Sequence, residues 1–328
     1  MCIRDRILAA LTEVRKQIHQ EGSYEQLLSE PFNQYLFTSL DKTVNAVAFN
    51  WKKRMAQTPF RPAYSELAFG SGNKLAGLKF KLDQLREIDL RGKIDRVDLA
   101  PYKNELLGQV IDYKSSSKNF DLALFASGIS LQMVSYLDVL AKNASFFGNE
   151  SLDLLGAFYQ TITKQVERLN KADQLDSNFL PKKALEQAKQ RLVYSGLLVN
   201  NEDYILTADP ELKEPKVSSK LYKSVRSKAR GGLTLPRDRH FTEDELKLVL
   251  RYNEYLIRKA GRAILTGDLA LNPYQYGQEN GLKYSSYQDI FFFDAKLAEN
   301  SYRKINSLDK ASFMQYIKEI LEKEEDNG

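Results

Sequence analysis

The residues best suited to chemistry are two aspartates and a lysine that lie close together in the sequence. Asp95 ends the segment Gly-Lys-Ile-Asp, and Asp112 precedes Lys114 by two positions in Val-Ile-Asp-Tyr-Lys. Side chains two positions apart in a strand share one face, so Asp112 and Lys114 can act together. Converging carboxylates favour a bound divalent cation, which polarises a phosphodiester and activates a water molecule. We therefore predict phosphodiester hydrolysis, with Lys114 holding that water or stabilising the developing charge.

Further polar side chains extend this candidate site. Glu66 stands upstream in Tyr-Ser-Glu-Leu-Ala-Phe-Gly and adds a carboxylate that can reach the metal. Gln132 and Tyr136 are four positions apart in a stretch with helical periodicity, so they share one face of a helix. An Asp-x-Lys triplet on an exposed strand is often only a solvated face. Here it ends the apolar run at 105–113, which favours a functional interpretation.

Composition limits the kind of metal site that the chain can build. Cys2 is the only cysteine, and His19 and His240 are the only histidines. A thiolate cluster and a histidine-rich zinc site are therefore not expected, and oxygen ligands favour Mg²⁺, Mn²⁺ or Ca²⁺. No apolar run approaches the roughly 18 residues that span a bilayer, and no leader peptide is evident. We expect a cytoplasmic protein without a membrane partner.

Hydrophobic periodicity predicts the elements that position these side chains. Helical spacing predicts helices at 7–19, 31–55, 121–142 with a break near Gly128, 181–193, 242–259 and 312–324. Alternation predicts strands at 77–82, 87–98, 105–113 and 152–162, and residues 196–208 are also expected to be extended. Thr242 and Glu245 form a capping-box pattern at the start of their helix. The order indicates an α/β protein, with a mixed sheet flanked by helices.

A basic segment stands out against the modest net charge of +5. Between positions 216 and 230 there are six basic residues and no acidic one. Such a loop suits DNA phosphates, but a partner-binding surface and a merely solvated loop remain open. The candidate DNA-binding residues are Lys216, Lys220, Lys223, Arg226, Lys228 and Arg230.

Together these motifs resemble the PD-(D/E)xK nucleases of the RecB type, and more narrowly the C-terminal part of RexB/AddB-type subunits of ATP-dependent helicase/deoxyribonucleases. The resemblance continues through Gly-Ile-Ser-Leu-Gln from 128, Gly-Ala-Phe-Tyr from 156 and Leu-Asn-Pro-Tyr from 271, and it covers most of the chain from about residue 60. It implies a restriction-endonuclease-like core at 61–170. A helical lead-in at 1–60 would belong to a larger upstream region, and 171–328 would form an extension packed on the nuclease.

The resemblance also implies a ligand set for Mg²⁺ or Mn²⁺. Asp95 and Asp112 would hold the metal with the backbone carbonyl of Tyr113, and Glu66 would support the metal or its water. The family has a further metal-contacting histidine upstream. His19 lies in no matching motif, so we expect that histidine in the upstream part of the protein.

Many relatives close this region with an iron–sulfur cluster held by cysteines near the C-terminus. The corresponding positions here are Leu282, Ser285 and Phe291, which offer no thiolate. The resemblance therefore implies a variant without an iron–sulfur cluster. We expect packing of aromatic side chains in its place, from Tyr284, Tyr287 and residues 291–293.

By resemblance, Lys114 is the catalytic lysine, and Gln132 and Tyr136 position it or the DNA end. The implied activity is exonuclease cleavage of single-stranded DNA, fed by a motor in a RexA/AddA-type partner subunit, during resection of double-strand breaks for recombinational repair. The glycine-rich stretch 70–74 lacks the spacing of a phosphate-binding loop, so the ATPase lies elsewhere. Two alternatives remain: another nuclease of the same fold, and a nuclease-like scaffold that binds DNA or a partner without catalysis.

Overall fold

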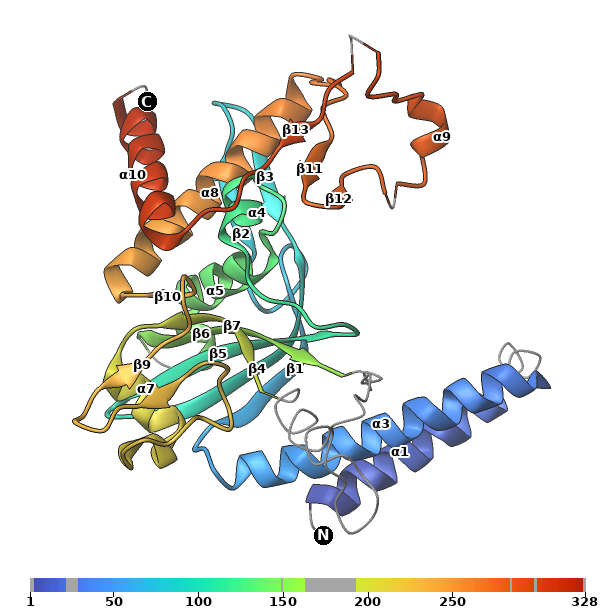
Figure 1. Ribbon diagram of the computed structural model, residues 1–328, viewed down its shortest axis with the longest axis vertical. Helices are drawn as coiled ribbons and strands as arrows, with labels where there is room; N and C mark the ends of the chain where they lie inside the picture. The colour runs from blue at the N-terminus through green and yellow to red at the C-terminus, as the bar shows by residue number, and fades with distance from the viewer. Residues whose placement is uncertain are drawn as a thin grey trace, which may run out of the picture.

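A six-stranded sheet organises the chain, as the computed structural model in Figure 1 shows. The structure describes residues 3–21, 29–148, 150–162, 193–283, 285–297 and 300–326. The strands in spatial order are β1 (Arg61–Phe69), β4 (Gly92–Tyr102), β5 (Glu105–Lys114), β6 (Leu152–Thr161), β7 (Ser195–Val199) and β10 (His240–Phe241). The β5–β6 and β7–β10 pairs are parallel and the other pairs antiparallel. The predicted α/β fold with a mixed sheet is confirmed.

The central position of β5 follows from its sequence. Six consecutive residues of β5, from Leu107 to Asp112, are buried, as expected for a strand covered on both faces. A parallel partner needs a crossover connection, and here two helices supply it. They are α4 (Leu122–Ala126) and α5 (Gln132–Lys142), separated at Gly128 with φ +79°. The predicted helix with a break near Gly128 is therefore confirmed.

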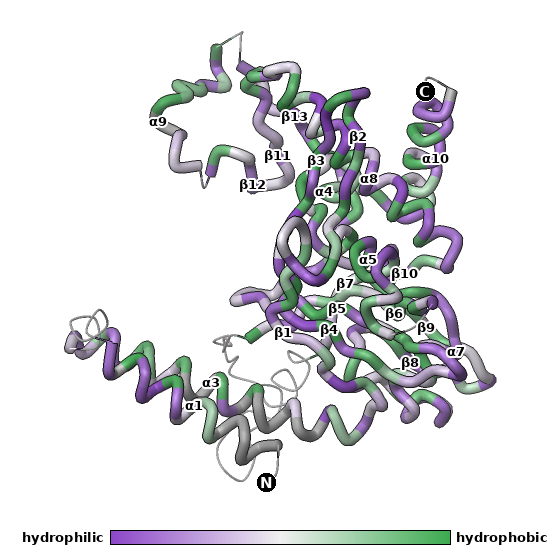
Figure 2. Tube along the Cα trace, turned by 180° about the vertical axis from the view of Figure 1, so that it is seen from behind, coloured by the Kyte–Doolittle hydropathy of each residue, from purple (hydrophilic) through white to green (hydrophobic). Residues whose placement is uncertain are grey.

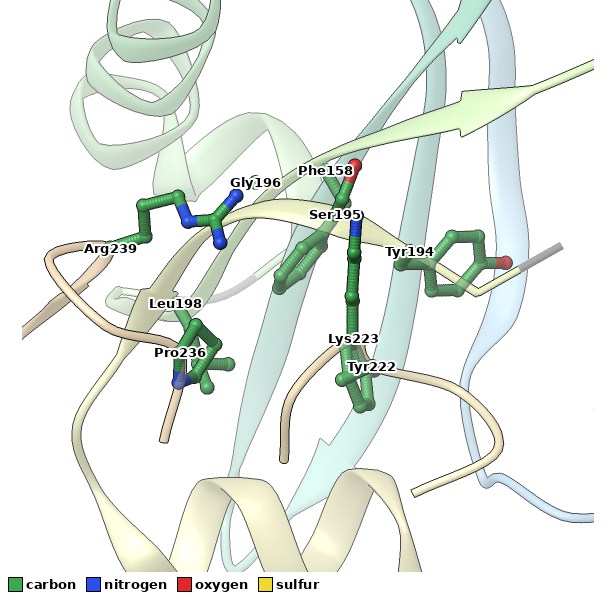
Figure 3. A pocket seen from close by; sticks show the side chains of 9 residues that line it. All are labelled: Phe158, Tyr194, Ser195, Gly196, Leu198, Tyr222, Lys223, Pro236 and Arg239. Atoms are coloured by element: carbon green, nitrogen blue, oxygen red, sulfur yellow. The ribbon is translucent and has the colours of Figure 1, made fainter. Parts of the chain in front are cut away.

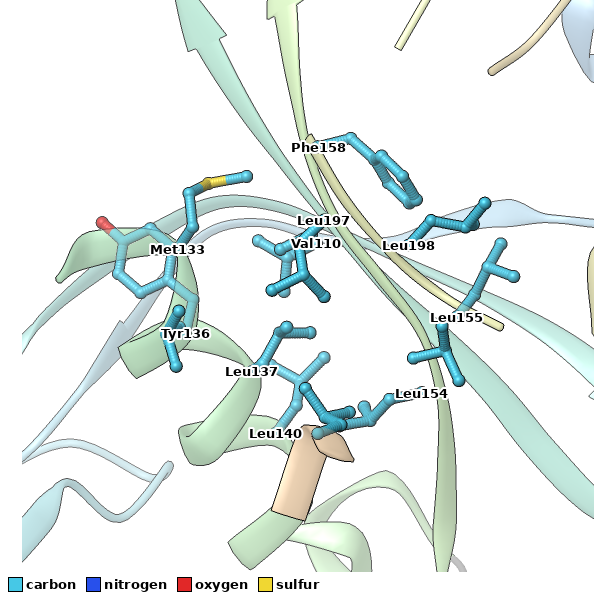
Figure 4. Packing of buried hydrophobic residues seen from close by; sticks show 14 of the residues in the cluster. Val110, Met133, Tyr136, Leu137, Leu140, Leu154, Leu155, Phe158, Leu197 and Leu198 are labelled. Atoms are coloured by element: carbon cyan, nitrogen blue, oxygen red, sulfur yellow. The ribbon is translucent and has the colours of Figure 1, made fainter. Parts of the chain in front are cut away.

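The main core lies between α5 and the sheet. Figure 4 shows Leu137 and Leu140 of α5 close to Val110 of β5 and Leu154 of β6. Leu137, Leu140 and Val110 have no exposed surface, so this contact fixes α5 over the middle of the sheet. Burial of each such side chain contributes about 1.5–3 kcal/mol. Gln132 begins this helix, so the packing also sets the position of its polar N-terminal turn.

Two further helices, α8 (Glu243–Leu265) and α10 (Lys310–Asp326), pack outside the crossover helices, α8 against α5 and α10 against α8 and α4. The helix α8 begins with the predicted capping box, in which Thr242 and Glu245 each bond the other's backbone N–H. It contacts α5 through a buried hydrogen bond from Asn253 Nδ2 to Ser135 Oγ (3.2 Å). The last helix, α10, packs on α8 through Phe313, which has no exposed surface.

The remaining elements are peripheral. Helices α1 (Ile3–Gln20) and α3 (Pro31–Met55) form a hairpin that projects from the sheet (Figure 1). The helical spacing predicted both helices. The others are β2 (Leu78–Lys81), β3 (Glu87–Leu90), η1 (Ala144–Phe147), α7 (Glu202–Ala208), η2 (Pro210–Lys213), β8 (Arg226–Ser227), β9 (Leu233–Thr234), β11 (Tyr274–Tyr276), β12 (Glu279–Asn280), α9 (Gln288–Phe291) and β13 (Arg303–Lys304). None of the helices in the described ranges is long and apolar enough to cross a membrane.

Several predicted elements differ from the structure. Residues 61–69, for which no strand was predicted, form β1. The predicted strand 87–98 is divided into β3 and β4 at Arg91. The extended prediction for 196–208 is wrong beyond Val199, because Asn201 caps a helix whose first turn carries Glu202 and Asp203. The predicted helix at 181–193 falls almost entirely outside the described residues. Two strands of the sheet, β7 and β10, lie beyond residue 170 in the sequence. The proposed division into domains stays a prediction.

The expectation of an aromatic cluster near the C-terminus is wrong for most of its residues. Tyr287, Phe291 and Phe292 are 62%, 41% and 84% exposed. Phe293 has an aromatic neighbour, Tyr302, at 4.7 Å between ring centroids, and the exposed rings of Tyr287 and Phe291 lie 6.4 Å apart. Main-chain pairing of β11 with β12 and β13 closes this segment on itself, and the Tyr276 hydroxyl, which donates to Asp121 Oδ2 at 2.8 Å, joins it to the start of α4. Neither contact requires an aromatic core. Figure 2 shows the loop around α9 standing away from the sheet, and Tyr284 lies outside the described residues.

Candidate active site

The candidate site lies where β4 and β5 part. Their pairing ends at Arg96 and Ile111, so Asp95 stands opposite Asp112, one position beyond the last pair. There the Tyr113 backbone N–H donates to Asp95 Oδ2 at 2.8 Å. The Asp95 carboxylate thus takes the place of a backbone acceptor. The sheet geometry brings the two predicted aspartates side by side.

Asp112 and Lys114 share a face, as predicted. Lys114 Nζ lies 2.6 Å from Asp112 Oδ2, and the Asp112 side chain is only 1% exposed. Burial raises the pKa of Asp112, Lys114 acts in the opposite direction, and the charge of Asp95 raises it further. A carboxylate in this setting is stabilised by additional positive charge, which a divalent cation supplies.

A chain of hydrogen bonds connects Lys114 to the N-terminal turn of α5. Lys114 Nζ donates to Gln132 Oε1 (3.3 Å), and Gln132 Nε2 donates to the Tyr136 hydroxyl (3.0 Å). The Tyr136 hydroxyl donates to the backbone carbonyl of Lys93 at 2.7 Å. Burial raises the pKa of Tyr136, and the nearby carboxylates add to the shift. The two predicted α5 residues therefore connect the lysine to β4, two positions before Asp95.

Glu66 lies at the edge of this group. It stands between two residues of β1 that pair with Ile94 and Arg96, so it is opposite Asp95. Its carboxylate forms an ion pair with Lys93, and its side chain is 60% exposed. Its φ of +52° lies in the left-handed region, which costs about 1–3 kcal/mol and is typical of functional sites. The structure places Glu66 near the aspartates but outside the hydrogen-bonded chain, and its role stays a prediction.

The oxygen atoms available to a metal are limited. In the described part of the chain, no group of three or more Asp, Glu, His or Cys side chains gathers closely enough to hold an ion. A cation at Asp95 and Asp112 would therefore need backbone or water oxygens as well. The side chain of His19 is not described, so it contributes no geometry.

A buried polar network lies behind the site, and it was not predicted from the sequence. The Arg96 guanidinium donates to Asp98 Oδ2 (3.0 Å), the Tyr194 hydroxyl (2.6 Å) and the Tyr113 hydroxyl (2.7 Å). Arg96 is 2% exposed and Asp98 4%. The alternation in Asp-Arg-Val-Asp places Arg96 and Asp98 together on the face opposite Asp95, but it does not indicate the two tyrosine partners. The network fixes Tyr113, the residue between Asp112 and Lys114.

The basic loop presents its charges outward. All six predicted DNA-binding residues are exposed, while Leu221, Tyr222 and Val225 between them are buried. Lys220 pairs with Glu211 at 2.7 Å. Their role in DNA binding stays a prediction.

Lys223, from the same loop, reaches Asn119 after β5, donating to its Oδ1 at 3.5 Å. Figure 3 shows Lys223 and Arg239 beside a cavity of about 10 Å³. That cavity is about the size of one water molecule, so it is not a nucleotide site.

Comparison with known proteins agrees with this geometry. The sequence model of the PD-(D/E)XK nuclease superfamily matches residues 4–276. The chain is 48% identical over 317 residues to a subunit of the ATP-dependent helicase/deoxyribonuclease of Lactobacillus gasseri, a match that covers 95% of this chain and 27% of that protein. The corresponding protein of Lactobacillus helveticus is 50% identical over 323 residues, with 96% and 28% covered. That of Lactiplantibacillus plantarum is 32% identical over 316 residues, with 94% and 26% covered. The chain thus spans about a quarter of the length of these relatives.

Proposed function

The chain belongs to the PD-(D/E)XK nuclease superfamily, and from this premise we propose that it is a metal-dependent deoxyribonuclease that hydrolyses single-stranded DNA. One observation carries the proposal: Asp95, Asp112 and Lys114 meet where β4 and β5 part. The proposal goes beyond the family assignment in three respects: the requirement for a metal ion, the preference for single-stranded DNA and the role within a larger complex.

The donor atoms fit Mg²⁺ or Mn²⁺. The N–H and C=O of one residue in an antiparallel strand point to the same neighbour, and the Tyr113 N–H points to Asp95. The Tyr113 carbonyl is thereby directed to the same gap as the two carboxylates. Hard oxygen donors of this kind suit Mg²⁺, with water completing the coordination. When bound, the cation would polarise the phosphodiester and lower the pKa of a water ligand.

The side chains around this position have separate tasks. The Lys114 ammonium, held between Asp112 and Gln132, stabilises the charge that develops on phosphate oxygens or orients the attacking water. Gln132 and Tyr136 keep that lysine in place relative to β4. Preorganisation of this kind lowers the barrier because no group must reorient during the reaction. Glu66 would support the metal or its water after leaving Lys93.

The relatives suggest the larger setting. Their names describe one subunit of an ATP-dependent helicase/deoxyribonuclease. We propose that this chain is the nuclease part of such a subunit and that a RexA/AddA-type partner supplies the motor and feeds single-stranded DNA. Resection of double-strand breaks for recombinational repair would be the outcome. The basic loop would contact DNA or the partner.

We also propose that this chain carries no iron–sulfur cluster. By the resemblance, Leu282, Ser285 and Phe291 correspond to the family's cysteines, and the sequence has a single cysteine, Cys2. Four thiolates normally hold such a cluster. Iron and acid-labile sulfide would be measured in protein purified without oxygen, and a stoichiometric amount of both would refute this part.

A non-catalytic scaffold is the second candidate, favoured by the ion pair that occupies Glu66 and Lys93. The test compares Lys114→Ala with Lys247→Ala in the full-length subunit assembled with its partner. Lys247 is an exposed lysine on α8, paired with Asp244 at 2.8 Å. Mg²⁺-dependent degradation of labelled single-stranded DNA should be lost in Lys114→Ala and kept in Lys247→Ala. Equal cutting by both variants, or none by the wild type, would favour the scaffold.

A further inference from the structure

A second lysine, outside the family motif, stands beside the candidate site. Lys118 Nζ lies 5.5 Å from the ring centroid of Tyr159, and Lys114 Nζ lies 5.8 Å from the same ring. Tyr159 is 2% exposed and pairs with Asp112 across β5 and β6. Cations at such distances are attracted to an aromatic ring. One buried ring therefore holds two ammonium groups next to the candidate metal-binding carboxylate.

The two lysines differ in their partners. The Lys114 ammonium is engaged by Asp112 at 2.6 Å and by Gln132 at 3.3 Å. In the described ranges, no carboxylate oxygen lies within 4.0 Å of Lys118 Nζ. Partial burial and the charge of Lys114 lower the pKa of Lys118, while Asp112 acts in the opposite direction. Among the residues that the structure describes, Lys118 is thus a cation without a bound anion, in a place where neighbouring positive charge disfavours it.

The backbone around Lys118 is fixed although its side chain is exposed. The Ser195 hydroxyl, from β7, donates to the Lys118 carbonyl at 2.7 Å. The next residue, Asn119, accepts from Lys223, and Asp121 caps α4 and accepts from the Tyr276 hydroxyl at 2.8 Å. Anchors from separate elements thus hold this loop. These hydrogen bonds to other elements of the fold therefore fix the backbone position of Lys118.

We propose that Lys118 binds a non-bridging phosphate oxygen of the DNA strand, at a phosphate adjacent to the scissile one. The inference rests on the proposed nuclease function and adds a substrate contact to it. In the proposed function, the scissile phosphate binds at Asp95, Asp112 and Lys114. Lys118 Nζ lies more than 4.0 Å from the carboxylate oxygens of Asp112, beyond the distance of an ion pair. The single negative charge of an incoming phosphodiester would offset the charge of Lys118, while Lys114 stays paired with Asp112. Lys118 therefore acts in binding and positioning, and Lys114 acts at the reacting atoms.

The salt dependence of DNA binding tests this contact. Each phosphate contact to a single strand contributes about 0.7 to the slope of log Kd against log salt concentration. Lys118→Gln should reduce that slope by about 0.7, and Lys118→Arg should restore it. Binding of a labelled oligodeoxythymidine would be followed by fluorescence anisotropy, with EDTA present to prevent cleavage. The protein is the full-length subunit in its assembly, and Lys247→Gln is the matched control with an unchanged slope.

Cleavage in Mg²⁺ separates this inference from the proposed function. Lys118→Gln should raise KM and leave kcat near the wild-type value, because it removes a contact made equally in ground and transition states. If the wild type cuts DNA but the slope of Lys118→Gln is unchanged, the inference about Lys118 fails alone. If the wild type does not cut, the proposed function fails. Lys118→Met serves as a second neutral variant, and disagreement between it and Lys118→Gln in the slope would also overturn the contact.

Discussion

Replacing Arg96 by methionine tests whether the buried network behind the site supports β4 and β5. The Arg96 and Asp98 side chains are 3% and 5% exposed, with Arg96 Nε 2.8 Å from Asp98 Oδ1. Methionine keeps much of the length of arginine but removes its charge and every hydrogen bond. Asp98 would retain the donor Gln109 Nε2 at 3.1 Å. The variant therefore leaves a buried carboxylate without its cation.

The expected cost follows from that burial. Removing one partner of a buried ion pair destabilises a protein by about 3–5 kcal/mol, because the remaining charge is not solvated. For large domains, each kcal/mol lowers Tm by about 2 °C, so Arg96→Met should lower Tm by about 6–10 °C. Replacing both partners removes the unpaired charge. Arg96→Met/Asp98→Leu should consequently be more stable than Arg96→Met.

Thermal unfolding at pH 7, followed by far-UV circular dichroism, measures both variants beside the wild type. Nuclease rates at 25 °C, where all three stay folded, would show whether the network also positions Tyr113 for catalysis. A single variant within about 1 kcal/mol of the wild type would refute the buried ion pair. A double variant no more stable than the single one would refute the role of the unpaired charge.

The remaining predictions concern pH, backbone space and the hydrogen-bonded chain. Burial raises the pKa of Asp138 to about 6 from 3.8, so the folded state binds its proton more tightly. Wild-type stability should then fall by up to about 3 kcal/mol as pH rises from 4 to 6, and Asp138→Asn should flatten this profile in urea unfolding. Gly156→Ala would place a Cβ 2.1 Å from a backbone oxygen and should cost about 3 kcal/mol or more in thermal unfolding. Gly72→Ala meets no atom within 4 Å and should cost about 1–2 kcal/mol, from its positive φ. Tyr136→Phe loses the bond to the Lys93 carbonyl and should lower kcat roughly tenfold or more, with a stability loss of about 1 kcal/mol.

Each of these predictions has a contradicting result. The same slope of stability against pH in Asp138→Asn and wild type would show that another group titrates. Equal stability of Gly156→Ala and Gly72→Ala would contradict the close approach of β6 and β7. If Tyr136→Phe has the same kcat as the wild type, the hydrogen-bonded chain does not contribute to catalysis.

The features predicted from sequence are those set by local periodicity. The period of two placed Asp112 and Lys114 on one face, and the helical period did the same for Gln132 and Tyr136. The capping box of α8 was predictable because its two residues are three positions apart. Such local signals fix which side chains point together.

Features that depend on distant segments could not be predicted. Arg96 finds the Tyr194 hydroxyl 98 positions away, and no periodicity encodes that pairing. The aromatic packing expected around Phe292 rested on the resemblance to relatives with an iron–sulfur cluster, whereas the exposure of Phe292 depends on which element covers it. The ion pair of Glu66 with Lys93 also arises from tertiary geometry. The helix α7 is different, because the Asn201 cap was a local signal that the apolar alternation obscured.

Asp112 is proposed to help hold the metal ion with which the protein cuts DNA. The most direct test compares wild type and Asp112→Asn in the full-length assembly, measuring degradation of labelled single-stranded DNA over a range of Mg²⁺ concentrations. Asparagine keeps the shape of the side chain and removes its charge, so folding should be kept. We expect cutting that requires Mg²⁺ in the wild type and is lost in the variant at every Mg²⁺ concentration. Equal cutting by the two proteins, or cutting by the wild type in excess EDTA, would contradict this role of Asp112.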